Sequence, residues 1–162
     1  MPVSAARGEI GQLLFLIDTA YDHVSWHGTN LRGSIRGVTP AQAAWRPGPR
    51  RHNIWELVVH AAYWKYVAWR RLTGAERGSF AEDGSNWFMR PTDKSVAAWK
   101  ADVAMLGETH RVLRAVVAAV NPRDLDRTVS KRSRTTRRAL ITGIAAHDIY
   151  HAGQIQLLKR LR

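Results

Sequence analysis

The chain has 162 residues, of which 45% are hydrophobic; this suits one folded domain over residues 1–162 and excludes disorder along the whole length. It contains no cysteine, which excludes disulfides, thiolate metal ligands and a cysteine nucleophile. The net charge is +12, with 25 Lys and Arg against 13 Asp and Glu. Such a charge either attracts nucleic acid, acidic lipid or small anionic substrates, or belongs to a solvated surface with no dedicated partner.

The sequence shows no targeting or membrane segment. Residues 1–9 lack the basic stretch and apolar run that mark a signal peptide. No apolar run approaches the roughly 20 residues that a membrane-spanning helix needs. We therefore expect a cytoplasmic protein that does not enter a membrane.

The first part of the chain predicts one helix from about Ala5 to Ile35. Its apolar side chains recur at helical steps along one face: Leu13, Ile17, Ala20, Val24, Leu31 and Ile35. Thr39 as N-cap, with Pro40 at the first helical position, then predicts a short helical turn through Trp45.

Three further helices are predicted downstream. The second begins after Asn53, whose spacing to Glu56 is that of a capping box, and ends at Gly74. A loop over 74–91 follows, and loops of this length are often lids or pocket walls. The third helix runs from about Thr92 to Asn121-Pro122, and the fourth from Thr135 or Thr136 to the C-terminus. Each has one apolar face, so the pattern predicts an all-α four-helix bundle.

Two histidines in the last helix, His147 and His151, indicate a metal site. They lie four residues apart on one helical face, within a stripe of apolar residues that would otherwise be core. Imidazoles at this spacing can bind one ion, and His60, at the edge of the second helix's inward stripe, supplies a third ligand. The alternative is that these are hydrogen-bonded core histidines without a metal.

Residues 147–155, HDIYHAGQI, followed by LLKR at 157–160, resemble the last helix of the DinB/YfiT-like superfamily. The upstream His60, the segment 39–45 and the helix start at Asn53 agree with this resemblance, which covers essentially the whole chain. It implies a four-helix bundle with long first and last helices. It also implies one divalent ion (zinc, nickel, iron or manganese) bound by His60, His147 and His151.

Other residues are candidates for the surroundings of the metal. Asp148 is expected either to orient a ligand imidazole or act as a base, or else to be a surface carboxylate paired with an arginine. Gln154 is expected to bond a water or a neighbouring loop. His27, on the apolar stripe of the first predicted helix, and the tryptophans Trp45 and Trp87 are candidate pocket residues.

By resemblance, the expected activity is metal-dependent transfer of a small anionic thiol to an electrophile. Relatives include S-transferases and an isomerase that use thiols such as bacillithiol or mycothiol, and a metal-dependent hydrolase is the alternative. Arg46, Arg50 and Arg51 near the expected mouth suit an anionic small-molecule substrate. A non-catalytic, nucleic-acid-binding bundle is less favoured, because the basic run 131–138 is not accompanied by a recognition motif. A homodimer is expected because relatives commonly pair.

Overall fold

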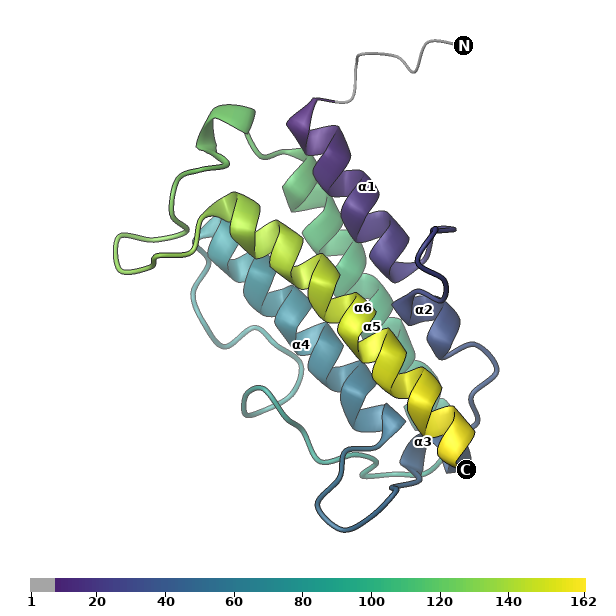
Figure 1. Cartoon of the computed structure of the whole chain (residues 1–162). Coiled ribbons are helices and arrows are strands. Elements are labelled where there is room, and N and C mark those ends of the chain that lie inside the picture. The colour runs from purple at the N-terminus through teal and green to yellow at the C-terminus, as the bar shows by residue number, and fades with distance from the viewer. Residues whose placement is uncertain (1–7) are drawn as a thin grey trace.

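A computed structural model describes residues 8–162, and this part of the chain is helical without a β-sheet (Figure 1). The all-α class predicted from the sequence is therefore confirmed. A single antiparallel bridge joins Thr128 to Thr136. The elements in chain order are α1 (Glu9–Tyr21), α2 (Leu31–Ser34), α3 (Pro40–Ala44), α4 (Ile54–Thr73), α5 (Val96–Ala118), the 3-10 turn η1 (Pro122–Asp124) and α6 (Arg137–Leu161).

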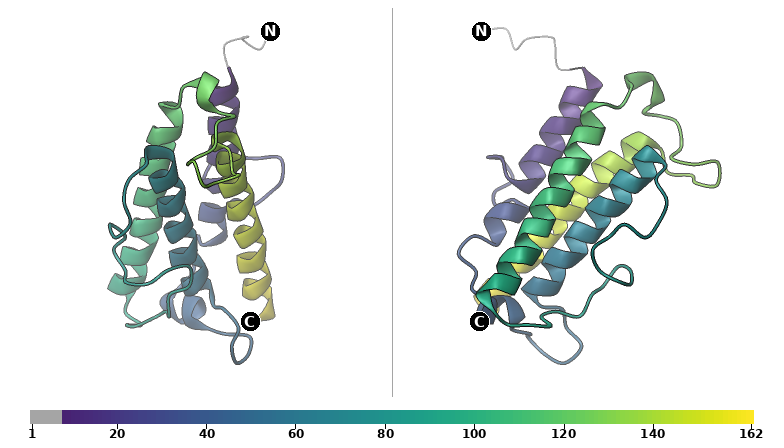
Figure 2. Two further views of the ribbon diagram at one scale, coloured as in Figure 1. Left: turned by 90° about the vertical axis from the view of Figure 1, so that its left-hand side faces the viewer. Right: turned by 180° about the vertical axis from the view of Figure 1, so that it is seen from behind.

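The helices α1, α4, α5 and α6 pack along one another. The helix α4 contacts both α5 and α6, and α1 contacts both α6 and α5, as the views from three sides show (Figures 1 and 2). Buried apolar side chains fill the space between them in two clusters. One is centred on Trp55 and Leu106, and the other on Leu113 and Ile141, all four of which are completely or almost completely buried.

Side-chain caps set the ends of α3, α4 and α6 as the sequence predicts. Asn53 accepts a hydrogen bond from the backbone N–H of Glu56 at 2.8 Å, and Gly74 ends α4 with a left-handed φ of 77°. Thr136 caps α6 in the same way. The expected reciprocal bond from Glu56 back to Asn53 is wrong, because the Glu56 carboxylate instead binds Arg46 and His52.

The prediction of one long first helix is wrong. Helix α1 ends at Tyr21, and residues 22–30 form an irregular segment before α2; the predicted start at Ala5 lies outside the described residues. Asn30 donates a hydrogen bond to the backbone oxygen of His23 and caps α2, and Gly28 has a φ of 100°. Side chains that bond to nearby backbone compete with helix formation, and this competition overrides the apolar periodicity. Val24, assigned to the buried stripe, is 99% exposed.

Helix α5 starts later than predicted, at Val96 instead of near Thr92. Ser95 is its N-cap, and the Ser95 hydroxyl and backbone N–H are both bonded to the carboxylate of Asp93. None of the described helices is long and apolar enough to cross a membrane.

The cap of α4 yields a testable prediction about stability. Asn53 is fully buried and also donates to the backbone oxygen of Arg90 at 2.8 Å. Asn53→Ala therefore leaves the buried N–H of Glu56 without its partner and removes one of the two donors to the Arg90 oxygen, the other being Arg46. We expect a loss of about 2 kcal/mol in the free energy of unfolding, measured with urea. Asn30→Ala removes the cap of the short helix α2 and should cost less than about 1 kcal/mol. Equal losses in the two variants would contradict this role of Asn53.

Candidate metal centre

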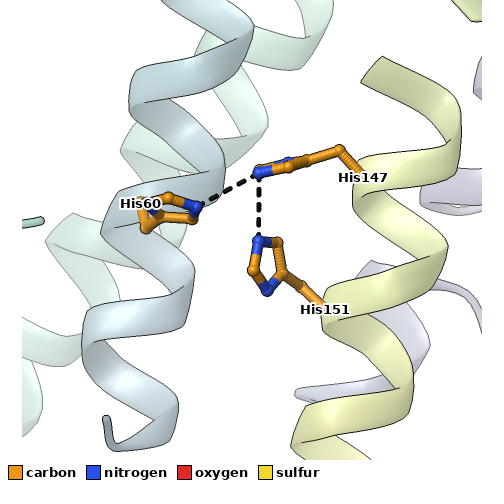
Figure 3. A group of neighbouring side chains, drawn as sticks. All are labelled: His60, His147 and His151. Atoms are coloured by element: carbon orange, nitrogen blue, oxygen red, sulfur yellow. Dashed lines mark hydrogen bonds between the residues drawn. The ribbon is translucent and has the colours of Figure 1, made fainter. Parts of the chain in front are cut away.

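Helices α4 and α6 bring three imidazoles together. His60 lies on α4, and His147 and His151 lie one turn apart on α6 (Figure 3). The Nε2 atom of His147 is 3.1 Å from Nε2 of His60 and 3.0 Å from Nε2 of His151. The three ligand atoms all lie within 4.8 Å of one another. His60 and His151 are buried, with exposed fractions of 5% and 3%.

The outer nitrogens of two of these rings are fixed by hydrogen bonds. The Nδ1–H of His60 donates to the backbone oxygen of Asn86 at 2.7 Å. The Nδ1–H of His151 donates to Oε1 of Gln154 at 2.6 Å. A neutral imidazole carries one hydrogen, so the Nε2 atoms of both rings present lone pairs toward His147.

His147 cannot satisfy both lone pairs. Its Nε2 can carry one hydrogen at most, and its Nδ1 is buried without a hydrogen-bond partner among the described residues. At least one pair of nitrogens therefore faces each other lone pair to lone pair, which is costly in a buried place. A cation among the three nitrogens removes this conflict. Metal–nitrogen bonds of about 2.0–2.1 Å at angles of 90–109° place ligand nitrogens about 2.9–3.4 Å apart, and two of the separations have this value.

The three imidazoles are held in the neutral form that binds divalent metals. Burial lowers the pKa of His60 to about 4 and that of His147 to about 3, and the neighbouring imidazoles add to both effects. Burial also lowers the pKa of His151, against the opposing effect of the hydrogen bond that His151 donates to Gln154. A protonated imidazole would therefore not compete with a metal near neutral pH.

Trp87 covers the triad from the loop 74–91. Its indole is stacked between the rings of His52 and His60, with centroid distances of 3.6 and 3.8 Å and interplanar angles of 6° and 10°. His52 is bonded through Nδ1 to Glu56 at 2.9 Å. Trp87 is among the residues expected here from the sequence, and His52 is not. Its spacing of four residues to Glu56 at the start of a helix is the signal that could have found it.

Asn86 is a second residue of the site that was not expected from the sequence. Its φ of 65° is left-handed, a conformation that asparagine adopts more readily than most residues. This conformation directs its backbone oxygen to His60 and its side-chain Oδ1 to the indole N–H of Trp64, at 2.9 Å. The residue type alone signals a turn, but only the fold shows which imidazole the turn contacts.

Asp148 neither contacts an imidazole of the triad nor lies on the surface, and its expected role as a base stays a prediction. It is 1% exposed and forms a buried ion pair with Lys65 of α4, so it is not a surface carboxylate bonded to arginine. No hydrogen bond joins it to the triad within residues 8–162, where Asn86 and Gln154 orient the ligand rings instead. Adjacent residues on a helix point about 100° apart, which is why Asp148 turns away from the histidine triad.

Two other candidate pocket residues are not brought to the triad. His27 is exposed in the segment 22–30, because the helix expected to carry it ends at Tyr21. Trp45 ends α3 and packs, partly buried, against the core cluster that contains Trp55. Within residues 8–162, neither has a hydrogen bond or ring contact with the three histidines.

Gln154 provides a test of how the triad is oriented. Gln154→Ala removes the acceptor that fixes the His151 ring, and we expect the affinity for zinc to fall about 10- to 100-fold. The measurement is competition with a chromogenic chelator. Gln156→Ala is the matched control, because its amide donates to Thr29 at 3.0 Å and does not contact the triad. Equal affinities for the Gln154 variant and the parent would show that this hydrogen bond does not support metal binding.

The comparison with known protein families agrees with the histidine geometry. No curated protein and no solved structure matches the chain. A family model described as the DinB superfamily matches residues 23–155, which is more than half of the chain and includes all three histidines. The chain therefore belongs to the DinB superfamily.

Proposed function

We propose that this protein is a metal-dependent enzyme that transfers a small anionic thiol to an electrophile. One divalent ion (zinc, nickel, iron or manganese) is held by His60, His147 and His151 in a single four-helix domain formed by α1, α4, α5 and α6. The observation that carries the proposal is the convergence of three Nε2 atoms whose rings are neutral and whose hydrogens cannot satisfy one another.

Three protein ligands are typical of a catalytic metal site, because they leave coordination positions for a substrate or water. When bound, the ion supplies Lewis acidity that stabilises a thiolate or hydroxide near neutral pH. The residues of the chain prepare the site for this chemistry. Asn86 and Gln154 hold the ligand rings in one tautomer, and Trp87 covers one face of His60 and restricts water there.

The basic segment 46–51 contributes differently from what the sequence suggests. Arg46 is bonded by both guanidinium nitrogens to Glu56, at 2.8 and 2.5 Å, so its charge is compensated. Arg50 and Arg51 are exposed and precede His52, which stacks on Trp87 next to the triad. These two arginines are therefore the ones available to attract an anionic thiol toward the metal.

A hydrolase is the closest alternative, since the same ion can activate water instead of a thiol.

A nucleic-acid-binding protein is the second alternative, and one observation favours it. A hollow of about 590 Å³ between the end of α4 and the loop before α6 is lined by five arginines and no acidic residue: Arg70, Arg71, Arg77, Arg132 and Arg134. Salt-sensitive oligonucleotide binding that is lost in Arg132→Ser/Arg134→Ser, with the metal retained, would support this alternative.

Cytoplasmic location and a homodimer stay predictions. The homodimer is predicted because relatives commonly form dimers. Sedimentation velocity at micromolar concentration tests it, and a sample that is monomeric throughout would contradict it.

Metal content is the first test of the proposal. We expect the purified protein, or the protein incubated with zinc, nickel, iron or manganese, to hold about one ion per chain by mass spectrometry under native conditions. The folded His147→Ala/His151→Ala variant should hold none. His23→Ala/His27→Ala is the matched control, because these histidines have the same spacing but are exposed, and it should keep the ion. A parent that takes up no ion would show that the histidines only pack.

Activity separates the two enzymatic readings. The metal-loaded protein should accelerate consumption of bacillithiol or mycothiol by an electrophile above the rate without protein, and the variant lacking His147 and His151 should not. Ester and amide substrates are tested in parallel. Hydrolysis without thiol transfer would replace the transferase by the hydrolase, while metal binding without either activity would indicate a binding protein.

A further inference from the structure

A second polar site lies between α1, α2 and α5, on the side where α1 and α5 run together (Figure 2). It is a pocket of about 350 Å³, and Tyr21 of α1 and His110 of α5 form part of its wall. Both side chains are more than nine-tenths buried, with exposed fractions of 4% and 6%. Their rings are stacked at a centroid distance of 3.8 Å, so each holds the other in place.

The hydrogen on His110 can be placed from its neighbour. The ammonium group of Lys65 lies 3.4 Å from Nδ1 of His110, and an ammonium group can only donate. The Nδ1 atom must therefore accept, and the neutral ring carries its hydrogen on Nε2. Burial, together with the charge of Lys65, lowers the pKa of His110 to about 3, so the neutral ring is the form present near neutral pH.

Tyr21 and His110 both have unused hydrogen-bonding atoms. Within residues 8–162, Oη of Tyr21 and Nε2 of His110 have no protein partner, yet neither atom is sealed from solvent. Burial raises the pKa of Tyr21 to about 12, so its hydroxyl keeps its hydrogen. Gly107 has no side chain to cover this hydroxyl, since a Cβ there would lie 3.6 Å from it. The pocket wall therefore presents two donors, one O–H and one N–H.

The charges around the pocket determine which ligand suits these donors. Arg114 is bonded through two nitrogens to Asp18, at 2.7 and 2.8 Å, and Asp22 accepts from His23 at 2.7 Å. Arg32 also lines the pocket, close enough for its charge to act on Tyr21, and has no carboxylate partner among the described residues. Arg111, which also lines the pocket, is paired with Glu108. Among the described residues, the lining groups left without a hydrogen-bond partner thus include one guanidinium and two neutral donors. They suit a ligand that supplies acceptors and a single negative charge, because the carboxylates of Asp18 and Asp22 lie nearby.

We propose that this pocket binds a small monocarboxylate, whose oxygens accept hydrogen bonds from Tyr21 and His110 and pair with Arg32. The nearby carboxylates of Asp18 and Asp22 disfavour a doubly charged phosphate next to the single unpaired guanidinium. This site is separate from the histidine triad. Lys65 of α4, which contacts His110, is paired with Asp148 of α6. His60 and His147 belong to the same two helices, α4 and α6, but project from other faces of them.

The test is a titration of the full chain with acetate and, separately, with pyruvate. Binding is monitored through the imidazole resonances of His110 in ¹H–¹⁵N NMR spectra. Before ligand is added, the spectrum should show the Nε2–H tautomer. A saturable shift of the His110 resonance should follow with each carboxylate. In the His147→Ala/His151→Ala background the shift should persist, because a carboxylate bound at a metal would be lost there.

Two single substitutions test the contacts. Arg32→Ala alters an exposed side chain and should weaken binding about tenfold or more, because hydrogen bonds to charged groups are the strong ones. Tyr21→Phe keeps the stacked ring and removes only the hydroxyl, and it should also weaken binding. Arg36→Ala is the control, as an exposed arginine outside this pocket, and should bind like the parent.

Several results would overturn the proposal. These are the absence of a saturable shift, an equal shift with chloride, an affinity unchanged by Arg32→Ala, or tighter binding of inorganic phosphate than of either carboxylate.

Discussion

The buried ion pair between Lys65 of α4 and Asp148 of α6 is the interaction around which this protein is arranged. Each residue is 1% exposed, and a buried charge is costly unless an opposite charge compensates it. The ammonium group also reaches His110 of α5 and lies 4.9 Å from the ring centre of Tyr21 on α1. One side chain of α4 thus contacts groups from the other three long helices, and this fixes how α4 and α6 face each other.

Two polar sites depend on that arrangement. His147 precedes Asp148 in the chain, projects toward His60 and completes the triad. Its Nε2 atom lies 3.1 Å from that of His60 and 3.0 Å from that of His151, which leaves little tolerance for a shift of α6. On another side of the same helices, Lys65 fixes the tautomer of His110 and so turns an N–H toward the second pocket. A single central contact therefore sets the geometry of the histidine triad and of the second pocket.

Local signals in the sequence predicted much of the fold. Asn53, Gly74 and Thr136 mark the ends of α4 and α6 correctly, because a cap depends on residues only three or four positions away. The prediction of a long first helix was wrong for a related reason. Apolar periodicity continued through residues 22–30, but side-chain bonds such as that from Asn30 to the backbone of His23 were not visible in a pattern of hydrophobic residues.

The sequence by itself determined the all-α class, the ends of α3, α4 and α6 and the identity of the three histidines, since helical spacing and a local motif carry that information. It could not determine what surrounds them. Asn86 reaches His60 over 26 positions, and Lys65 reaches Asp148 over 83. Such partners depend on how segments distant in the chain pack together, so only the tertiary structure decided that Asp148 pairs with Lys65 in the core while Asn86 orients a ring of the histidine triad.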